Sequence, residues 1–482
     1  MALRLVALNA KALWFDETFS VFVASLPVQR LLTILAANEP HPPLHFLMLH
    51  AWMGVFGDSE AAVRAPSVLI GAAIVILTWL FGWRLIGPAP ALVAAILVAV
   101  SPSQVAVGQE ARMGALLVAT ALGSWWALWT ATSGNSRRAW VAYVLTSAAM
   151  LYSHYYGFFV LASHAVYLVW RRTRPVEWRQ WMIAGLGTLG LFIPWLPAFL
   201  LQMAGGKPWP AHRLPLTPAM FVDTFALMTT GWPVVGVGDP RSWSIHTAGT
   251  PHIALVGFVA ALLLIAAGVR AKALQQQRAL LLCAAAGPVI FAYAASLVVN
   301  VYAPRYLILI MPAIALLIGA SLGPVIDAGR AWPKRVGPIV LLAALVVPNV
   351  LVLVSFYRQP ALDVFDWRKV SVALAASART DDAIVFLPGF SRIPVGYYFR
   401  GPQPRLALTP EGPDVLGPGG VRMSGIVSML TQHPRVWLVT VPPFPQSVKT
   451  LMAALGEASY RVQAHEQINI VWLLLFERTR RP

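Results

Sequence analysis

The sequence predicts an all-α multi-pass membrane protein, with about 10–11 transmembrane helices, interfacial helices and a small C-terminal α/β domain outside the cytoplasm. The chain has 482 residues, of which 58% are hydrophobic and 11% charged, with a mean hydropathy of +0.67. One soluble core stops growing near roughly 250–300 residues, so this much apolar sequence indicates a lipid environment. Long apolar windows recur along the chain, and near residue 357 they give way to short strand-like runs.

Apolar windows place the transmembrane helices, because about 20 apolar residues cross a bilayer. The predicted spans are 65–83, 89–107, 113–131, 140–153, 157–170, 182–200, 252–269, 279–300, 306–323 and 337–356. Two short windows meet at the sequence SHYYG, residues 153–157, which predicts a tight re-entry on one membrane face.

The first ten residues, MALRLVALNA, are apolar but only about half as long as a span, and they lack the cleavage site of a signal peptide. We expect a truncated first helix, which would give eleven spans and a cytoplasmic N-terminus. The alternative is a stub that lies on the membrane interface.

The chain is predicted to divide into three parts. Residues 1–64 hold the partial first helix and an outward segment whose apolar stretch LHFLMLHAWMGVF predicts interfacial helices. Residues 65–356 form the transmembrane body, with a long outward loop at 203–250. Residues 357–482 form the α/β domain: AIVFLP, RVWLVTV and INIVWLLLF predict buried strands, and DWRKVSVALAASA and PQSVKTLMAALGE predict helices.

Basic residues set the orientation by the positive-inside rule. They occupy every second loop, which is therefore cytoplasmic: Arg84, Arg137, Arg138, Arg171, Arg172, Arg174, Arg179, Arg270, Lys272, Arg278, Arg330, Lys334 and Arg335. The α/β domain then lies outside.

Acidic residues fall on the opposite side. Of the ten before the α/β domain, all but Glu177 and Asp327 are placed outward. Asp58, Glu60 and Asp239 fit the interpretation that they are solvated acids in loops. Asp16, Glu17 and Glu110 fit it less well, because each lies among apolar residues near the membrane, where an ionisable group is costly and often functional.

Composition also excludes some classes. The formal net charge is +17, but without a basic stripe, so a nucleic-acid partner is not expected. The single cysteine, Cys283, rules out an internal disulfide. A transporter or lipid flippase remains an alternative, although the sequence shows no internal repeat of the kind that transporters carry.

Outward charges of both signs suit the transfer of a group from a lipid-linked phosphate to a hydroxyl. That chemistry needs a base for the hydroxyl proton and cations for the departing phosphate. Asp16 is the candidate base. The candidate cations are Arg112 in GQEARMG, Arg305 in YAPRYL, Lys207 and Arg213.

Four motifs, in order over residues 1–320, resemble the signatures of C-superfold membrane glycosyltransferases. They are LRLVALNAKALWFDETFSV, EPHPPLHFLMLHAWMGVFGDSEAAVRAPSVLIGAA, SPSQVAVGQEARMGALL and LYSHYYGFF. The chain is most similar to the bacterial protein-O-mannosyltransferase-like branch, glycosyltransferase family 39, to which the lipid A aminoarabinose transferases are related.

The resemblance implies a glycosyltransferase of the bacterial inner membrane, with its active site facing the periplasm or cell exterior. It would move a sugar from a polyprenyl-phosphate donor to a lipid, glycan or protein acceptor; the sugar and acceptor stay open. The resemblance assigns Asp16 as catalytic base with Glu17 as support, and Glu110 as a further catalytic acid. It assigns Arg112, Arg305 and Tyr306 to the donor phosphate.

Two points depart from the family pattern or stay open. Lipid A transferases carry Glu-Lys directly before Pro-Pro, whereas this chain has Pro40-His41 there and Glu39 one place further back. We expect His41 to replace the lysine at the donor phosphate. Relatives sometimes hold a divalent metal ion near the acidic pair, so the cofactor stays open.

Structural roles compete at several positions. Glu17 could cap its own helix or pair with an arginine. His41 and His45, four residues apart, could share a metal ion, but Pro42-Pro43 favours a helix start. His154 fits a packed interfacial histidine, and Asp363 and Asp366 fit a helix start. A catalytically silent family member is a further alternative.

Overall fold

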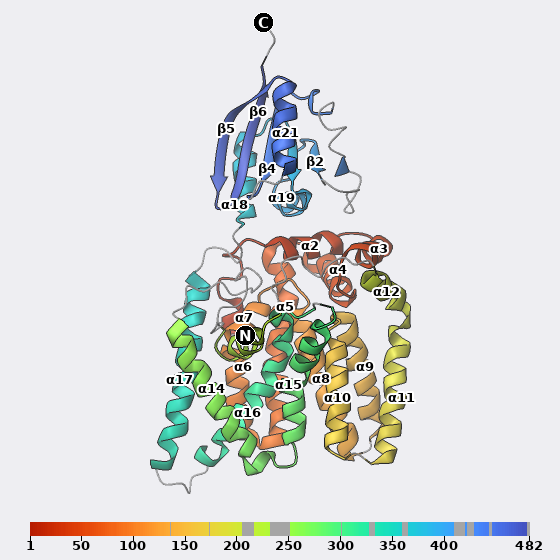
Figure 1. Ribbon diagram of the computed structural model, residues 1–482, viewed down its shortest axis with the longest axis vertical. Helices are drawn as coiled ribbons and strands as arrows, with labels where there is room; N and C mark the ends of the chain where they lie inside the picture. Colours follow the sequence, from red (N-terminus) through yellow and green to blue (C-terminus); the bar gives the residue numbers. More distant parts are fainter. Residues whose placement is uncertain are drawn as a thin grey trace. The chain divides into compact units, whose positions relative to one another are not determined.

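The structure is a computed structural model that describes residues 1–134, 136–172, 174–204, 216–231, 251–299, 301–326, 333–358, 365–408, 420–421, 429–442 and 446–479. Its contacts form two compact units (Figure 1). The first comprises Met1–Leu8 and Leu35–Gln359, and the second comprises Asn9–Ile34 and Pro360–Pro482. The predicted boundaries at residues 64 and 357 stay predictions, and the contacts group residues 9–34 with the C-terminal part of the chain.

The first unit is helical. Its helices are α1 (Ala2–Leu5), α4 (Leu44–Phe56), α5 (Glu60–Ile86), α6 (Pro88–Val100), α7 (Pro102–Val107), α8 (Gly114–Gly134), α9 (Arg137–Ser153), α10 (Gly157–Trp170), α11 (Pro175–Phe192), α12 (Leu196–Ala204), α13 (Pro218–Thr230), α14 (Pro251–Arg270), α15 (Arg278–Ser296), α16 (Met311–Ile326) and α17 (Pro333–Arg358). Short 3-10 turns are η1 (Ile193–Trp195), η3 (Lys272–Leu274) and η4 (Pro304–Ile310). Helix α3 (Val28–Asn38) crosses the division between the units.

The predicted multi-pass membrane fold is confirmed. Each predicted window falls largely on a helix. Within the described ranges, seven helices are long and apolar enough to cross a membrane. The windows at 89–107, 140–153 and 157–170 fall on α6 with α7, α9 and α10, which are shorter. The tight re-entry is also present, because α9 ends at Ser153 and α10 begins at Gly157.

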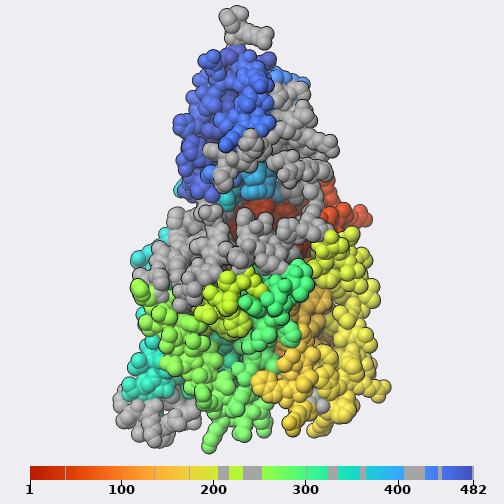
Figure 2. Space-filling view, in the orientation of Figure 1, coloured from red at the N-terminus to blue at the C-terminus, as the bar shows by residue number. Residues whose placement is uncertain are grey.

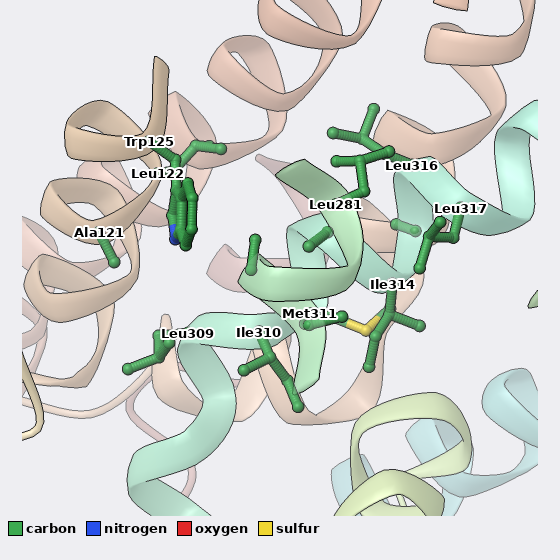
Figure 3. Close-up of a cluster of buried hydrophobic side chains, with 14 of the residues drawn as sticks. Ala121, Leu122, Trp125, Leu281, Leu309, Ile310, Met311, Ile314, Leu316 and Leu317 are labelled. Carbon is green, nitrogen blue, oxygen red and sulfur yellow. The ribbon is translucent and has the colours of Figure 1, made fainter. Parts of the chain in front are cut away.

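The segment formed by η4 and α16 lies at the centre of the helical unit. Its apolar window is 89% buried, against 28–56% for the other candidate spans. Figure 3 shows Leu309, Ile310, Met311 and Ile314 of this segment among side chains of neighbouring helices, including Leu281 of α15. The segment therefore fixes Arg305 and Tyr306, at its first turn, to the best-packed part of the unit.

The surface of the helical unit is apolar where helices lack protein neighbours. On α11, Ile183, Leu186 and Leu201 of the continuing α12 are 58%, 70% and 66% exposed. On α14, Val256 and Leu263 are 56% and 51% exposed. These helices, yellow and green in Figure 2, present the surface expected against lipid chains.

Connectivity separates two ends of the helical unit. Helix α8 leads away from the 108–113 turn, and α9 leads back to the 154–156 turn; α10 leads away again to Arg171. The basic residues Arg138 and Arg171 thus lie at the ends of helices remote from these two turns. Arg84, near the end of α5, is separated from the 108–113 turn by the length of α6. In Figure 1 the α10–α11 connection is at the lower end of the bundle, and α4 and α12 are at the upper end.

The second unit is an α/β domain joined by an N-terminal helix, α2 (Phe15–Ala24). Its other elements are α18 (Trp367–Ser377), β1 (Ala383–Leu387), η5 (Gly389–Ser391), α19 (Arg392–Tyr398), β2 (Arg405–Leu408), β3 (Gly420–Val421), β4 (Arg435–Thr440), α21 (Gln446–Glu457), β5 (Tyr460–Ile468) and β6 (Val471–Arg478). The predicted α/β domain, its three buried strands and its two helices are confirmed.

The sheet has the order β3-β2-β1-β4-β6-β5. Strands β3, β2, β1 and β4 are parallel, and β6 and β5 add an antiparallel hairpin. Side chains of α18, including Trp367 and Leu374, pack with Ile384 and Phe386, whereas those of α21, including Leu451, pack with Val385. Alternate residues of β1 therefore belong to two apolar clusters, one on each face of the sheet.

Candidate functional site

Four segments that are distant in the sequence meet in the first unit. They are residues 39–41 before α4, 110–112 before α8, 154–156 between α9 and α10, and 304–306 at the start of η4. Each is a turn or a helix start. Together they bring five of the seven predicted site residues, His41, Glu110, Arg112, Arg305 and Tyr306, into one unit.

The Glu39 carboxylate lies at the centre of the charged groups. It is 13% exposed; His41 Nδ1 hydrogen-bonds to it, and Arg112 Nη2 lies 3.6 Å from its Oε1. Burial raises the pKa of Glu39, and the positive charges of Arg112 and Arg305 oppose that rise. Two guanidinium groups from different segments therefore act on one carboxylate.

The loop that carries Glu39 is held by side chains of the α9–α12 region. Gln202 Nε2 donates to the carbonyl oxygens of Leu35 and Glu39, at 2.9 Å each. Gln202 Oε1 accepts from the Tyr155 hydroxyl at 2.5 Å, and that hydroxyl accepts from Trp195 Nε1 at 2.9 Å. This chain of bonds joins the Glu39 loop to the SHYYG turn.

Pro42-Pro43 begins helix α4, as expected, with Pro43 as its N-cap residue. His45 points to the 110–112 segment, where its Nε2 donates to the Ala111 carbonyl oxygen at 3.1 Å. Burial, and next the Arg112 charge, lower the pKa of His45 to about 3. His45 is therefore a neutral structural contact between α4 and the segment that bears Arg112.

Aromatic rings and imidazoles line the same place. The His154 ring is 4.3 Å from the Tyr306 ring and 5.1 Å from the His41 ring, centroid to centroid. His154 Nδ1 accepts from the Tyr156 backbone N–H at 3.0 Å. Burial, followed by the charges of His41, Arg305 and Arg112, holds the pKa of His154 well below its usual value. His154 is packed, as its structural interpretation required, but it is packed against the site.

Arg305 is oriented by its neighbour. Its Nη2 donates to the Tyr306 hydroxyl at 2.7 Å, and its Cζ lies 4.8 Å from the Tyr306 ring centroid. The Tyr156 hydroxyl holds the residues just before η4. It accepts from the Ala303 N–H at 2.7 Å and donates to the Val301 carbonyl oxygen at 2.5 Å. The SHYYG motif thus supports Arg305 through the backbone.

Glu110 and Arg112 are both buried, at 6% and 7% exposure. Their segment is tied to the first residues of the chain by Gln109, whose Nε2 donates to the carbonyls of Arg4 and Val6 at 3.1 and 2.8 Å. Buried charges near the membrane are costly and often functional, and Arg112 Nη2 lies 3.6 Å from Glu39 Oε1. The segment is therefore a candidate for binding a charged group.

The acidic pair, Asp16 and Glu17, lies on α2 in the second unit. Glu17 is fully buried and accepts from the Trp14 backbone N–H at 3.3 Å, so its helix-capping interpretation is confirmed. Asp16 is partly exposed in the same first turn. Lys207 and Arg213, the other predicted cations, lie outside the described residues, as does Asp363; Asp366 caps α18, as expected, by accepting from the Lys369 N–H.

A metal centre is not assembled by the described side chains. No group of three or more His, Cys, Asp or Glu residues in those ranges is arranged to hold an ion. Glu39 and His41 offer two ligands, which is fewer than a protein metal site usually has.

Sequence reasoning did not assign Glu39 or His154 to the site. Glu39 is shifted by one place from the glutamate of the lipid A transferases, so only its position two residues before His41 indicated a role. No charged residue stands near His154 in the sequence. Its contact with Tyr306 joins residues from different parts of the chain. Such a contact has no sequence pattern.

Residues 40–197 match the family described as dolichyl-phosphate-mannose-protein mannosyltransferase. The structure is similar to that of ArnT from Cupriavidus metallidurans in the apo state, with a TM-score of 0.64, 13% identity and coverage of 98% of this chain and 96% of that one. No curated protein matches the sequence.

Two ligand-bound structures are also similar. ArnT from C. metallidurans bound to undecaprenyl phosphate gives a TM-score of 0.63 at 14% identity, covering 98% of this chain and 96% of that one. Archaeal oligosaccharyltransferase AglB from Archaeoglobus fulgidus, in complex with an inhibitory peptide and a dolichol-phosphate, gives 0.51 at 12% identity, covering 95% and 70%.

The chain has a fold similar to that of ArnT. The likeness confirms the fold that the four motifs predicted for residues 1–320, and it extends to 98% of the chain. The α/β domain after the last membrane helix is therefore part of the matched fold.

Proposed function

We propose that this chain is a membrane glycosyltransferase that moves a sugar from a polyprenyl-phosphate donor to an acceptor hydroxyl. The observation that carries the proposal is the convergence of Arg112 and Arg305 on one carboxylate in the first unit. Two guanidinium groups can hold the oxygens of a phosphate in fixed geometry. The family match and the fold support the same reaction class.

The phosphate site is assigned to Arg112, Arg305, Tyr306 and His41. In the transfer, the acceptor oxygen bonds to the anomeric carbon while the bond from that carbon to the phosphate oxygen breaks. Negative charge then grows on the departing polyprenyl phosphate, and the two guanidinium groups stabilise it. The Tyr306 hydroxyl, which accepts from Arg305, keeps that guanidinium oriented.

The proton of the acceptor hydroxyl goes to Asp16 in this proposal. Glu17 stabilises the first turn that presents Asp16, through its bond to the Trp14 N–H. Glu110 is assigned as a further acid of the site. These roles follow the resemblance, and inversion at the anomeric carbon follows from a single displacement.

In this proposal the donor phosphate site lies outside the cytoplasm. The turns that carry Arg112 and His154 lie at the helix ends remote from Arg84, Arg138 and Arg171, and the positive-inside rule assigns that basic end to the cytoplasm. We therefore propose a bacterial inner-membrane enzyme whose site faces the periplasm or cell exterior. The sugar transferred is a hexose or a pentose.

Donor turnover by wild type and Asp16→Asn tests the proposal. Undecaprenyl-phosphate mannose and undecaprenyl-phosphate aminoarabinose are supplied to the purified protein with host membranes as acceptor. A general base contributes about 10²–10⁴-fold to rate, so Asp16→Asn should lose at least about 10²-fold while its melting temperature stays near wild type. Near-wild-type turnover in the variant, or no turnover of either donor by wild type, would overturn the proposal.

A further inference from the structure

Helix α2, which carries Asp16, is fastened to the C-terminal α/β domain just before its first turn. The Leu13 backbone N–H donates to the Tyr398 hydroxyl at 2.7 Å, a bond between residues 385 positions apart in the chain. Arg368 Nη2 donates to the Asn9 carbonyl oxygen at 3.1 Å. Two side chains of the domain thus hold the backbone that leads into α2.

A ring contact fixes the first residue of the same helix. The Phe15 ring lies 5.1 Å from the Phe390 ring, centroid to centroid, at 68° between the planes. Phe390 belongs to η5, which follows β1 directly. Helices α2 and α19 also contact each other. The start of α2 is therefore held by a hydrogen bond and by an apolar contact.

Tyr398 connects the start of α2 to the sheet. It is the last residue of α19, which follows η5 and β1 in the chain, and β1 is an inner strand of the sheet. The Arg368 guanidinium lies 5.9 Å from the Tyr398 ring centroid, and the Tyr397 ring is 4.7 Å from it. Because these contacts fix the Tyr398 side chain, its hydroxyl also fixes the position of the Leu13 N–H that donates to it.

Hydrogen bonds hold the first turn of α2 together, so the position of Leu13 also determines the position of Asp16. Glu17 accepts from the Trp14 N–H, and Ser20 Oγ donates to the Asp16 carbonyl oxygen at 2.9 Å. Asp16 comes three residues after Leu13. A displacement of Leu13 therefore moves the carboxylate with the turn.

We propose that Tyr398 is a positioning residue for the transfer reaction and that one task of the α/β domain is to set the place of the Asp16 carboxylate. This inference rests on the proposed function, which makes Asp16 the base. It goes beyond that function in assigning a role to the α/β domain, which supplies none of the residues that the proposed function names.

The test is Tyr398→Phe in the full-length protein, which removes the hydroxyl and keeps the ring. Turnover is measured with whichever of undecaprenyl-phosphate mannose and undecaprenyl-phosphate aminoarabinose wild type uses. Because small misplacements of reacting groups reduce rate strongly, kcat should fall roughly tenfold while KM for the donor is unchanged. Unchanged kcat per folded protein, or a rise in KM alone, would overturn the inference.

Tyr460→Phe is the matched control. The Tyr460 hydroxyl lies 2.6 Å from the carbonyl oxygens of both Leu430 and His433, within the α/β domain. This variant also loses a buried hydroxyl and should lower the melting temperature by a similar amount, but kcat should stay at the wild-type value. A fall in kcat equal to that of Tyr398→Phe would show a general effect of domain stability and overturn the inference.

Asp16→Asn separates the two proposals. Normal turnover in Asp16→Asn refutes the proposed function and, with it, the positioning role. Lost turnover in Asp16→Asn together with wild-type kcat in Tyr398→Phe refutes the positioning role alone.

Discussion

Glu39 sets the charge balance among the site's cations. It has His41, Arg112 and Arg305 as charged or chargeable neighbours, and His154, whose pKa is held low by burial, stays neutral beside them. In the proposed function, a carboxylate there competes with the donor phosphate for the same guanidinium groups. Its protonation state should therefore control donor affinity.

Donor binding should strengthen as the pH falls through the raised pKa of Glu39. Burial raises that pKa, so the carboxyl takes up its proton at a higher pH than an ordinary glutamate, and the site gains one positive charge. The expected gain is roughly tenfold in affinity. Undecaprenyl-phosphate mannose is a suitable ligand because its phosphodiester does not titrate in this range.

Two variants check the source of this pH dependence. Glu39→Gln should bind the donor tightly at every pH, with a flat profile, whereas Asp58→Asn, which alters an exposed acid, should keep the wild-type slope. A Glu39→Gln profile as steep as that of wild type would assign the titration to another group.

Residue identities in the site were predictable only in part. Charged residues among apolar ones identified Arg112 and Arg305, because ionisable groups at membrane depth are rare. Glu39 and His154 required the fold, since their contacts join turns from different helices.

Glycines permit the closest helix approaches in the membrane unit. A Cβ at Gly268 of α14 would lie 1.9 Å from the Leu317 carbonyl oxygen of α16, and one at Gly319 of α16 would lie 2.4 Å from the Pro90 carbonyl oxygen of α6. Small residues allow such backbone contacts between membrane helices. They hold α16, and hence η4 with Arg305, in place.

Gly268→Ala should destabilise the protein because the carbonyl it meets is backbone and cannot move aside. Overpacking of this kind costs about 1–3 kcal/mol or more. Gly185→Ala on α11 is the control, because its Cβ would meet no atom within 4 Å. Thermal unfolding in detergent should show a lower melting temperature for Gly268→Ala only; equal melting temperatures would refute the close α14–α16 packing.

Elements were predicted best where hydrophobicity is continuous. The apolar windows located the membrane helices, and AIVFLP and RVWLVTV located β1 and β4, whose residues are fully buried. Strand β5 was missed because its side chains are mostly exposed and show no alternation. Its place in the sheet is fixed by pairing with β6, a tertiary contact.

At the scale of the whole molecule, the basic loops are predicted to face the cytoplasm and the turns that carry Arg112 and His154 to face the opposite side of the membrane. In a Cys283→Ala background, Val55→Cys, at a site 75% exposed near the end of α4, should react with a membrane-impermeant maleimide added to intact cells. Arg172→Cys, after α10, should react only after the cells are opened. The reverse pattern would invert the orientation and place the site in the cytoplasm.

Fold class and orientation follow from composition and loop charge, which act over the whole chain and leave a strong sequence signal. The grouping of residues 9–34 with 360–482 left no such signal. It depends on single contacts such as the bond from Leu13 to Tyr398.

The affinity of the purified protein for undecaprenyl phosphate tests the central claim most directly, that Arg112 and Arg305 form a lipid-phosphate site. Loss of one charge-assisted contact costs about 1.5–3 kcal/mol, or roughly 10- to 100-fold in Kd. Arg112→Gln and Arg305→Gln should each weaken binding by this factor, whereas Arg138→Gln, at the basic end, should bind as wild type does. Undiminished binding by both site variants, or no binding by wild type, would contradict the claim.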